Sequence, residues 1–102
     1  MKRNLYTKEE IILCTYIARF GRSKFDESDI HKLKERSISS IKMKVQNIAS
    51  MLVENGFEID SEVSILTGKP HGKKGRRTNW DIVEALAATN KIDLFNLCSK
   101  II

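Results

Sequence analysis

Proline, cysteine and glycine are scarce in this chain of 102 residues, which holds one, two and five of them respectively. The two cysteines, Cys14 and Cys98, stand far apart within apolar helical patterns, so neither metal-ligand spacing nor a disulfide framework is present. No run approaches the roughly 18 apolar residues of a membrane span, and no apolar segment of a secretory signal follows the basic N-terminus. These absences predict a single cytoplasmic domain with no cofactor, no metal and no membrane contact.

Catalytic motifs are missing as well. The two histidines, His31 and His71, do not belong to a set of converging metal ligands. A phosphate-binding loop would need a glycine where Lys73 stands, and the G-x-S-x-G motif of a serine nucleophile does not occur. We therefore expect a protein that is not an enzyme.

Positive charge is concentrated in one stretch of the chain, between Gly68 and Arg77. The chain has 18 Lys and Arg against 13 Asp and Glu, and five of the 18 lie in this stretch, which leaves 13 against 13 elsewhere. Mutual repulsion of the five cations favours an extended segment until a polyanion neutralises it. The stretch predicts a nucleic-acid partner, and the alternative is a charged linker that keeps the chain soluble. The five basic residues are Lys69, Lys73, Lys74, Arg76 and Arg77.

Two helices are predicted near the N-terminus. Thr7 and Glu10 form a capping box for a helix over 8–20, because each side chain can bond to the other residue's backbone amide. Asp26 is a suitable N-cap for a short helix over 27–34. Apolar side chains recur at helical spacing in both segments. The residues that we expect in the core are Leu13, Cys14, Tyr16, Ile17, Phe20, Ile30 and Leu33.

The third predicted helix has the clearest amphipathic pattern. It starts after Ser37, a good N-cap, and ends at Asn55 and Gly56. Its apolar residues recur every three or four positions, which predicts one face in the core. These residues are Ile38, Ile41, Val45, Ile48 and Leu52.

The opposite face of this third helix is polar and has no acidic residue from Ser37 to Leu52. Lys, Gln and Asn side chains can reach base edges in a major groove, whereas a carboxylate would be repelled by phosphates. We interpret this face as DNA-binding, with Arg36 fixing the register on the backbone. The alternative is an ordinary amphipathic helix whose solvated face is basic. The candidate residues are Ser39, Ser40, Lys42, Lys44, Gln46 and Asn47.

Two further helices are predicted after an extended segment. The alternation in 57–60 suggests a short strand or a tether that packs on the helices. Thr78 begins a stretch similar to a capping box, followed by a helix that ends near Asn90. The last helix is apolar enough to be either part of the core or the interface of a homodimer. Its apolar residues are Leu94, Phe95, Leu97, Cys98 and Ile101.

Two segments resemble those of Myb/SANT-type tri-helical helix-turn-helix domains. Such domains open with Trp or Tyr, Thr and two acidic residues, and their recognition helix carries Arg-[Ser/Thr]-x-x-[Ser/Ala]-[Ile/Val]-x-x-Lys. The matching segments are Tyr6-Thr7-Lys8-Glu9-Glu10 and Arg36-Ser37-Ile38-Ser39-Ser40-Ile41-Lys42-Met43-Lys44.

The chain is also similar to the small DNA-recognition module found ahead of some HNH endonuclease domains. That module has a Lys-[Leu/Val]-x-Asn-[Ile/Phe] segment, then a glycine-rich loop and a helix that begins with Trp. The counterparts are Lys44-Val45-Gln46-Asn47-Ile48, the loop 68–75 and Trp80. The resemblance implies DNA recognition without nuclease activity.

Together these observations predict a mostly α fold: a tri-helical helix-turn-helix core over 1–56, an extended segment and basic loop over 57–79, and C-terminal helices over 80–102. We expect one DNA-binding domain of regulatory, phage or mobile-element type, which places its third helix in the major groove of duplex DNA and its basic loop on phosphates. The N-terminal Lys2 and Arg3 form a second candidate arm. The alternative is an adaptor or inhibitor that binds a nucleic-acid-processing enzyme, such as an anti-restriction or anti-CRISPR antagonist.

Overall fold

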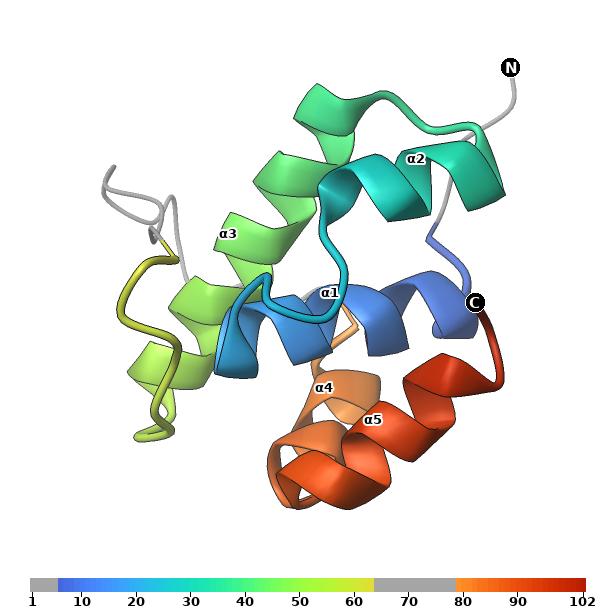
Figure 1. Ribbon diagram of the computed structural model, residues 1–102. Coiled ribbons are helices and arrows are strands. Elements are labelled where there is room, and N and C mark those ends of the chain that lie inside the picture. Colours follow the sequence, from blue (N-terminus) through green and yellow to red (C-terminus); the bar gives the residue numbers. More distant parts are fainter. Residues whose placement is uncertain (1–5, 64–78) are drawn as a thin grey trace.

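The computed structural model describes residues 6–63 and 79–102, and in these ranges the protein is mostly α-helical (Figure 1). The described ranges hold five helices and no strand. The mostly α fold class predicted from the sequence is therefore confirmed. The five basic residues of the predicted loop, and also Lys2 and Arg3, lie outside the described residues. The helices are α1 (Lys8–Phe20), α2 (Glu27–Lys34), α3 (Ile38–Glu54), α4 (Trp80–Ala87) and α5 (Lys91–Ser99).

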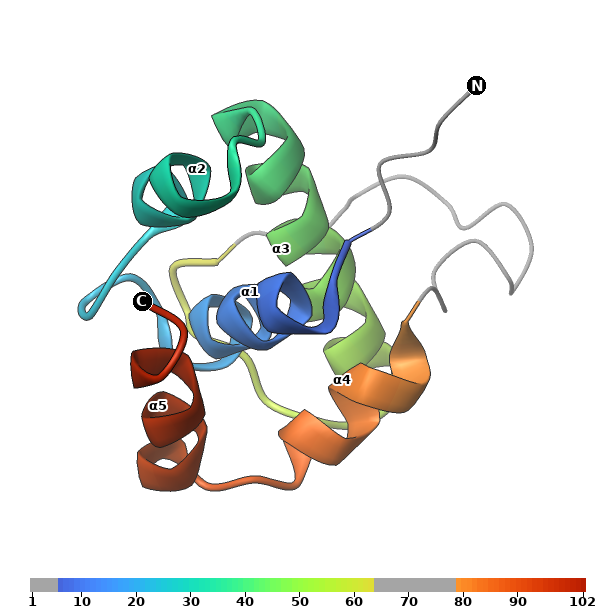
Figure 2. The ribbon, with the colours of Figure 1, turned by 90° about the vertical axis from the view of Figure 1, so that its right-hand side faces the viewer.

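Helix α1 lies at the centre of the molecule. All nine residues from Glu10 to Ala18 are buried, because α2 and α3 cover one side of the helix and α4 and α5 cover the other (Figure 2). A helix that is covered on every side buries more than the single apolar stripe seen in its sequence. The fold is thus organised around α1, and α3 is the longest helix packed against it.

The first three helices begin and end as the sequence predicts. The Thr7 hydroxyl accepts a hydrogen bond from the Glu10 amide at 3.2 Å, and the Glu10 carboxylate accepts one from the Thr7 amide at 2.7 Å. Asp26 caps α2 in the same manner, and the Ser37 hydroxyl accepts from the Ser40 amide at the start of α3. These local bonds replace the intrahelical partners that the first amides of a helix lack.

The end of α1 is held by a close contact with the segment that follows α3. Gly21 has φ +90° and ψ −166°, a conformation that is essentially restricted to glycine. A Cβ at this position would lie 2.9 Å from the Asp60 carboxyl group, and the Asp60 amide donates to the Ala18 carbonyl at 2.9 Å. Residues 57–63 form no strand, and they lie along the helices as the predicted tether would.

The C-terminal helices belong to the core. Leu94 and Cys98 of α5 are fully buried against α1. The Arg19 guanidinium of α1 donates to the carbonyl oxygens of Leu86 and Thr89, at the end of α4. These contacts join the two ends of the chain into one packed unit. No helix within 6–63 or 79–102 is long and apolar enough to cross a membrane.

Two local predictions are wrong. Leu33 and Ile38 were expected in the core, but they are 44% and 38% exposed, because they lie at the end of α2 and the start of α3, where neighbouring helices cover them less. Thr78, which opens the predicted capping box, lies outside the described residues, and α4 begins at Trp80. Its N-cap residue is Asn79, in the left-handed conformation with φ 67°, and the Asn79 side chain makes no cap hydrogen bond.

Candidate nucleic-acid interface

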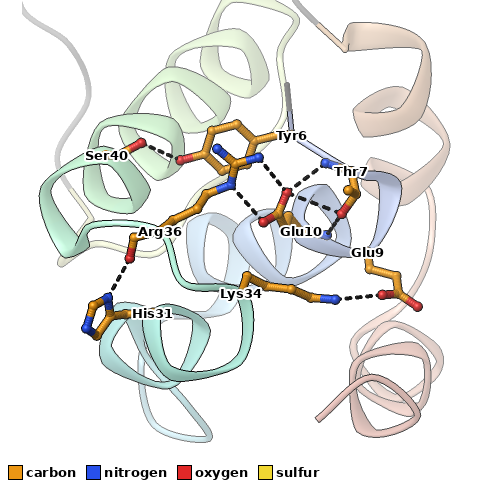
Figure 3. Close-up of polar contacts among 8 residues, drawn as sticks. All are labelled: Tyr6, Thr7, Glu9, Glu10, His31, Lys34, Arg36 and Ser40. Carbon is orange, nitrogen blue, oxygen red and sulfur yellow. Dashed lines mark hydrogen bonds and ion pairs between the residues drawn. The ribbon is translucent and has the colours of Figure 1, made fainter. Parts of the chain in front are cut away.

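A short turn joins α2 to α3 and sets the position of the predicted recognition helix. It spans three residues, Glu35 to Ser37. Glu35 adopts the left-handed conformation with φ 58°, and its amide donates to the His31 carbonyl at 2.9 Å. The His31 ring nitrogen Nδ1 contacts the Arg36 carbonyl oxygen (Figure 3). The turn is thereby bonded to the last residues of α2.

Arg36, predicted to bind the DNA backbone, is engaged inside the fold. Its Nε lies 2.7 Å from Glu10 Oε2 and its second guanidinium nitrogen lies 3.0 Å from Glu10 Oε1 (Figure 3). The guanidinium also lies 3.9 Å from the centroid of the Tyr6 ring. Burial alone would raise the pKa of Glu10, but hydrogen bonds from Arg36 and from the Thr7 amide outweigh it and lower that pKa. Arg36 thus ties the turn to the start of α1.

The start of α1 also contacts α3 directly. The Tyr6 hydroxyl lies 2.9 Å from the Ser40 hydroxyl on the exposed surface, and Lys34 Nζ lies 2.8 Å from a Glu9 carboxylate oxygen (Figure 3). Arg36 and Lys34, the two cations nearest the turn, therefore both have carboxylate partners on α1. The charge that this flank of α3 offers to a ligand is smaller than its sequence indicates.

The predicted DNA-binding face of α3 divides into two halves. In the N-terminal half Ser39, Ser40 and Lys42 are exposed. Met43, the residue after Lys42, is 57% exposed. Met43 is not among the candidate residues predicted for this face. The position of this methionine at helical spacing from the polar residues of that face is the signal that could have identified it.

In the second half of that face, Lys44, Gln46 and Asn47 are half-buried. Lys44 Nζ donates to Asn79 Oδ1 at 2.9 Å and lies 5.4 Å from the centroid of the Tyr6 ring. Burial lowers the pKa of Lys44. The three side chains are less accessible to a ligand than the sequence pattern suggests, because residues from other parts of the chain lie against α3.

The flank of α3 that carries Lys42 faces acidic residues. A surface groove on this flank is lined by both basic and acidic side chains. The acidic residues come from outside α3, so the sequence of α3 alone does not reveal them. Glu27 is 3% exposed and accepts from the Arg22 guanidinium at 2.9 Å. Lys42 is one of the groups that lower the pKa of Glu27, after Arg22, although burial alone would raise it. The lining residues are Arg22, Asp26, Glu27, Ser28, Ile38, Lys42, Gln46 and Glu62.

The charge of the protein is unevenly divided between its described and undescribed parts. Seven of the 18 Lys and Arg lie in 1–5 and 64–78, and the other 11 share the described ranges with all 13 Asp and Glu. The described residues therefore have a formal net charge of 11 minus 13, or −2, and the two remaining segments carry +7. The electrostatic attraction for a polyanion resides in these two segments.

Comparison with known proteins gave no match to a family model, to a curated protein or to a solved structure. Within the part of the chain that the structure describes, no group of three or more His, Cys, Asp or Glu side chains could hold a metal ion. The function must therefore be argued from the geometry of α3 and its surroundings.

Proposed function

We propose that this chain is a non-enzymatic DNA-binding protein, in which the exposed N-terminal half of α3 enters the major groove of duplex DNA. The two basic segments, 1–5 and 64–78, would bind the phosphates. The observation that carries this proposal is that the described residues next to both segments lie at α3.

Three observations locate the described residues that lie next to the basic segments. Tyr6, the first described residue after 1–5, bonds to Ser40 of α3. Asn79, the first described residue after 64–78, bonds to Lys44 of α3. On the other flank of α3, Glu62 lies in the groove that Lys42 also lines, just before the same segment. The described residues next to the two basic segments therefore lie around one helix.

The exposed half of α3 has the chemistry that base and phosphate contacts need. The hydroxyls of Ser39 and Ser40 can donate to phosphates and to base edges, and Lys42 can bind a guanine or a phosphate. Met43 can make an apolar contact with a thymine methyl group. A three-residue turn between α2 and α3 is compatible with a helix-turn-helix whose second helix reads the groove.

The remaining candidate residues have different proposed roles. We propose that Arg36 and Lys44 act by holding the fold, because both are engaged with neighbouring side chains. Gln46 and Asn47 stay at the edge of the interface. The basic loop residues bind phosphates and so raise affinity without reading sequence. These loop residues are Lys69, Lys73, Lys74, Arg76 and Arg77.

The acidic flank of α3 favours a second candidate function. Because Asp26, Glu27 and Glu62 lie close to Lys42, this groove could pair with a protein surface of mixed charge. In this alternative the chain would be an adaptor or inhibitor that docks on a nucleic-acid-processing enzyme, and its basic segments would bind the acidic part of that surface.

One pair of matched substitutions tests the proposed face. Ser39→Glu adds a carboxylate to the exposed first turn of α3, where a negative charge favours the helix, so the fold should be preserved. Ala85→Glu makes the same change in charge on the exposed surface of α4. We expect Ser39→Glu to weaken binding to mixed-sequence duplex DNA by about tenfold or more, because the new carboxylate faces phosphates, and Ala85→Glu to have a much smaller effect.

Binding would be measured by fluorescence anisotropy at fixed salt, with circular dichroism as the control for folding. Equal losses for the two variants would contradict a specific role of α3. Absence of duplex binding by the unsubstituted protein would favour the adaptor function.

A further inference from the structure

Lys44 contacts the two residues that directly follow the basic segments 1–5 and 64–78. Its Nζ is 2.9 Å from Asn79 Oδ1 and 5.4 Å from the centroid of the Tyr6 ring. Tyr6 follows the basic segment 1–5, and Asn79 follows 64–78. Figure 2 shows the starts of α1 and α4 on the same side of α3, in agreement with these contacts. The Lys44 ammonium group thus links Tyr6 and Asn79 to the middle of α3.

The conformation of Asn79 supports a specific role for this link. Asparagine at an N-cap position normally accepts a hydrogen bond from the first turn of the helix. Asn79 occupies that position of α4, but its side chain makes no cap bond and accepts from Lys44 instead. Its backbone takes the left-handed conformation, with φ 67°. The Asn79 side chain therefore bonds to α3 and not to the first turn of α4.

Lys44 differs from Lys42, which lies two residues earlier on the same helix. Lys42 is exposed, whereas Lys44 is half-buried between Tyr6 and Asn79. A lysine that binds phosphates needs an accessible ammonium group, and burial of Lys44 opposes this use. The sequence suggested the same role for both residues, but their surroundings separate them.

We propose that Lys44 is a positioning residue that holds the start of α4 beside Tyr6 and α3. This inference rests on the proposed DNA-binding function. With Tyr6 and Asn79 both at α3, the basic segments that precede them would reach the same duplex at a high effective concentration. Lys44 then increases affinity without contacting DNA itself.

The experiment compares Lys44→Met, Asn79→Gly and the double variant. Methionine keeps an unbranched side chain but removes the ammonium group, and glycine tolerates the positive φ while removing the acceptor. We expect each single variant to bind duplex DNA about fivefold more weakly or worse, and the double variant to bind no more weakly than either single one. The slope of log affinity against log salt should not change, because no phosphate contact is lost.

Lys42→Met is the matched control, since it also removes one ammonium group from α3. We expect it to reduce the salt slope by up to about 0.9 and to add to the effect of Asn79→Gly. Asn79→Gly removes the hydrogen bond with Lys44 but leaves the Lys44 side chain in place. The test therefore remains valid if Lys44→Met folds poorly.

Two results would overturn the inference. A reduced salt slope for Lys44→Met together with unchanged affinity for Asn79→Gly would show that Lys44 contacts a phosphate itself. Independent, additive losses in the double variant would show that the two residues do not act together. Either result leaves duplex binding by the unsubstituted protein intact, whereas failure of the proposed function would abolish that binding.

Discussion

At the scale of single residues, the hydroxyl of Tyr16 is unusual because it is buried without a hydrogen-bond partner among the described residues. The Tyr16 ring itself is well packed, with the rings of Phe20, Phe25 and Phe95 at centroid distances of 5.2 to 5.7 Å. A buried hydroxyl that makes no hydrogen bond costs about 1–3 kcal/mol of desolvation energy.

Tyr16→Phe should therefore keep the ring contacts and remove this cost. We expect the melting temperature to stay the same or to rise, with a gain in stability of up to about 1–3 kcal/mol in chemical denaturation. A loss of more than 1 kcal/mol, on the order of one lost hydrogen bond, would show that the hydroxyl has a partner in solution.

Glu10 differs from Tyr16 in that its buried carboxylate is fully engaged by Arg36 and Thr7. Glu10→Gln should cost up to about 3 kcal/mol at neutral pH, because it removes the negative charge that pairs with the half-buried Arg36 guanidinium. The exposed neighbour Glu9 pairs with Lys34 at the surface. Glu9→Gln is the control, and we expect it to change stability by less than about 1 kcal/mol.

The pKa of Glu10 is lower in the folded protein than its ordinary value of 4.5, so this carboxylate stabilises the fold above that pH. The contribution is lost as the pH falls below 4.5 and through the lowered pKa of the folded state. We expect the melting temperature of the protein to fall in this acidic range, and to fall less steeply for Glu10→Gln. Parallel pH profiles for the two proteins would contradict the assignment.

At the scale of helices, the apolar stripe of α3 is less uniform than its regular spacing suggests. Ile48 is fully buried, whereas Ile38 is 38% exposed at the start of the helix. We expect Ile48→Ala to cost about 2–5 kcal/mol and Ile38→Ala about 1 kcal/mol or less. Urea denaturation of both variants would measure this difference, and equal costs would contradict the burial pattern.

Helix α5 should be necessary for folding because Leu94 and Cys98 fill space against α1. We expect a chain truncated after Asn90 to lose its cooperative thermal transition in circular dichroism. A truncated chain that remains folded and monomeric, together with a dimeric full-length protein in sedimentation, would instead identify α5 as a dimer interface.

The helices could be predicted from sequence because their signals are local. The capping residues Thr7, Asp26 and Ser37 act on amides within three residues, and each one marks the start of a helix correctly. The start of α4 was predicted less well from the sequence, because the Asn79 side chain bonds to Lys44, which lies 35 residues earlier. Interactions over such distances have no signature in a local pattern.

The same limit applies to the candidate site. The acid-free face of α3 was evident, and Ser39 and Lys42 are exposed, as residues of a polar helix face are expected to be. The engagement of Arg36 with Glu10 could not be seen, because the two residues meet only when α1 packs beside the turn. The Myb/SANT resemblance rests on motifs within α1 and α3, and it remains a prediction.

At the scale of the whole molecule, the described fold and the basic segments have opposite charge. The described ranges carry −2, and the segments 1–5 and 64–78 carry +7. A slightly acidic fold has little intrinsic attraction for phosphates, so the segments must supply the electrostatic part of DNA binding. Tyr6 and Asn79, which follow these segments, both contact α3, so we propose that the segments act beside the helix that enters the groove.

The salt dependence of duplex binding tests this account most directly. It would be measured for the unsubstituted protein and for a variant with Lys69, Lys73, Lys74, Arg76 and Arg77 changed to Ser. We expect the variant's slope of log affinity against log salt to be smaller by up to about 4–5, at about 0.9 per phosphate contact, with an equal loss of affinity on all duplex sequences. An unchanged slope, or loss of discrimination between sequences without a change in slope, would contradict the proposal that these residues bind phosphates.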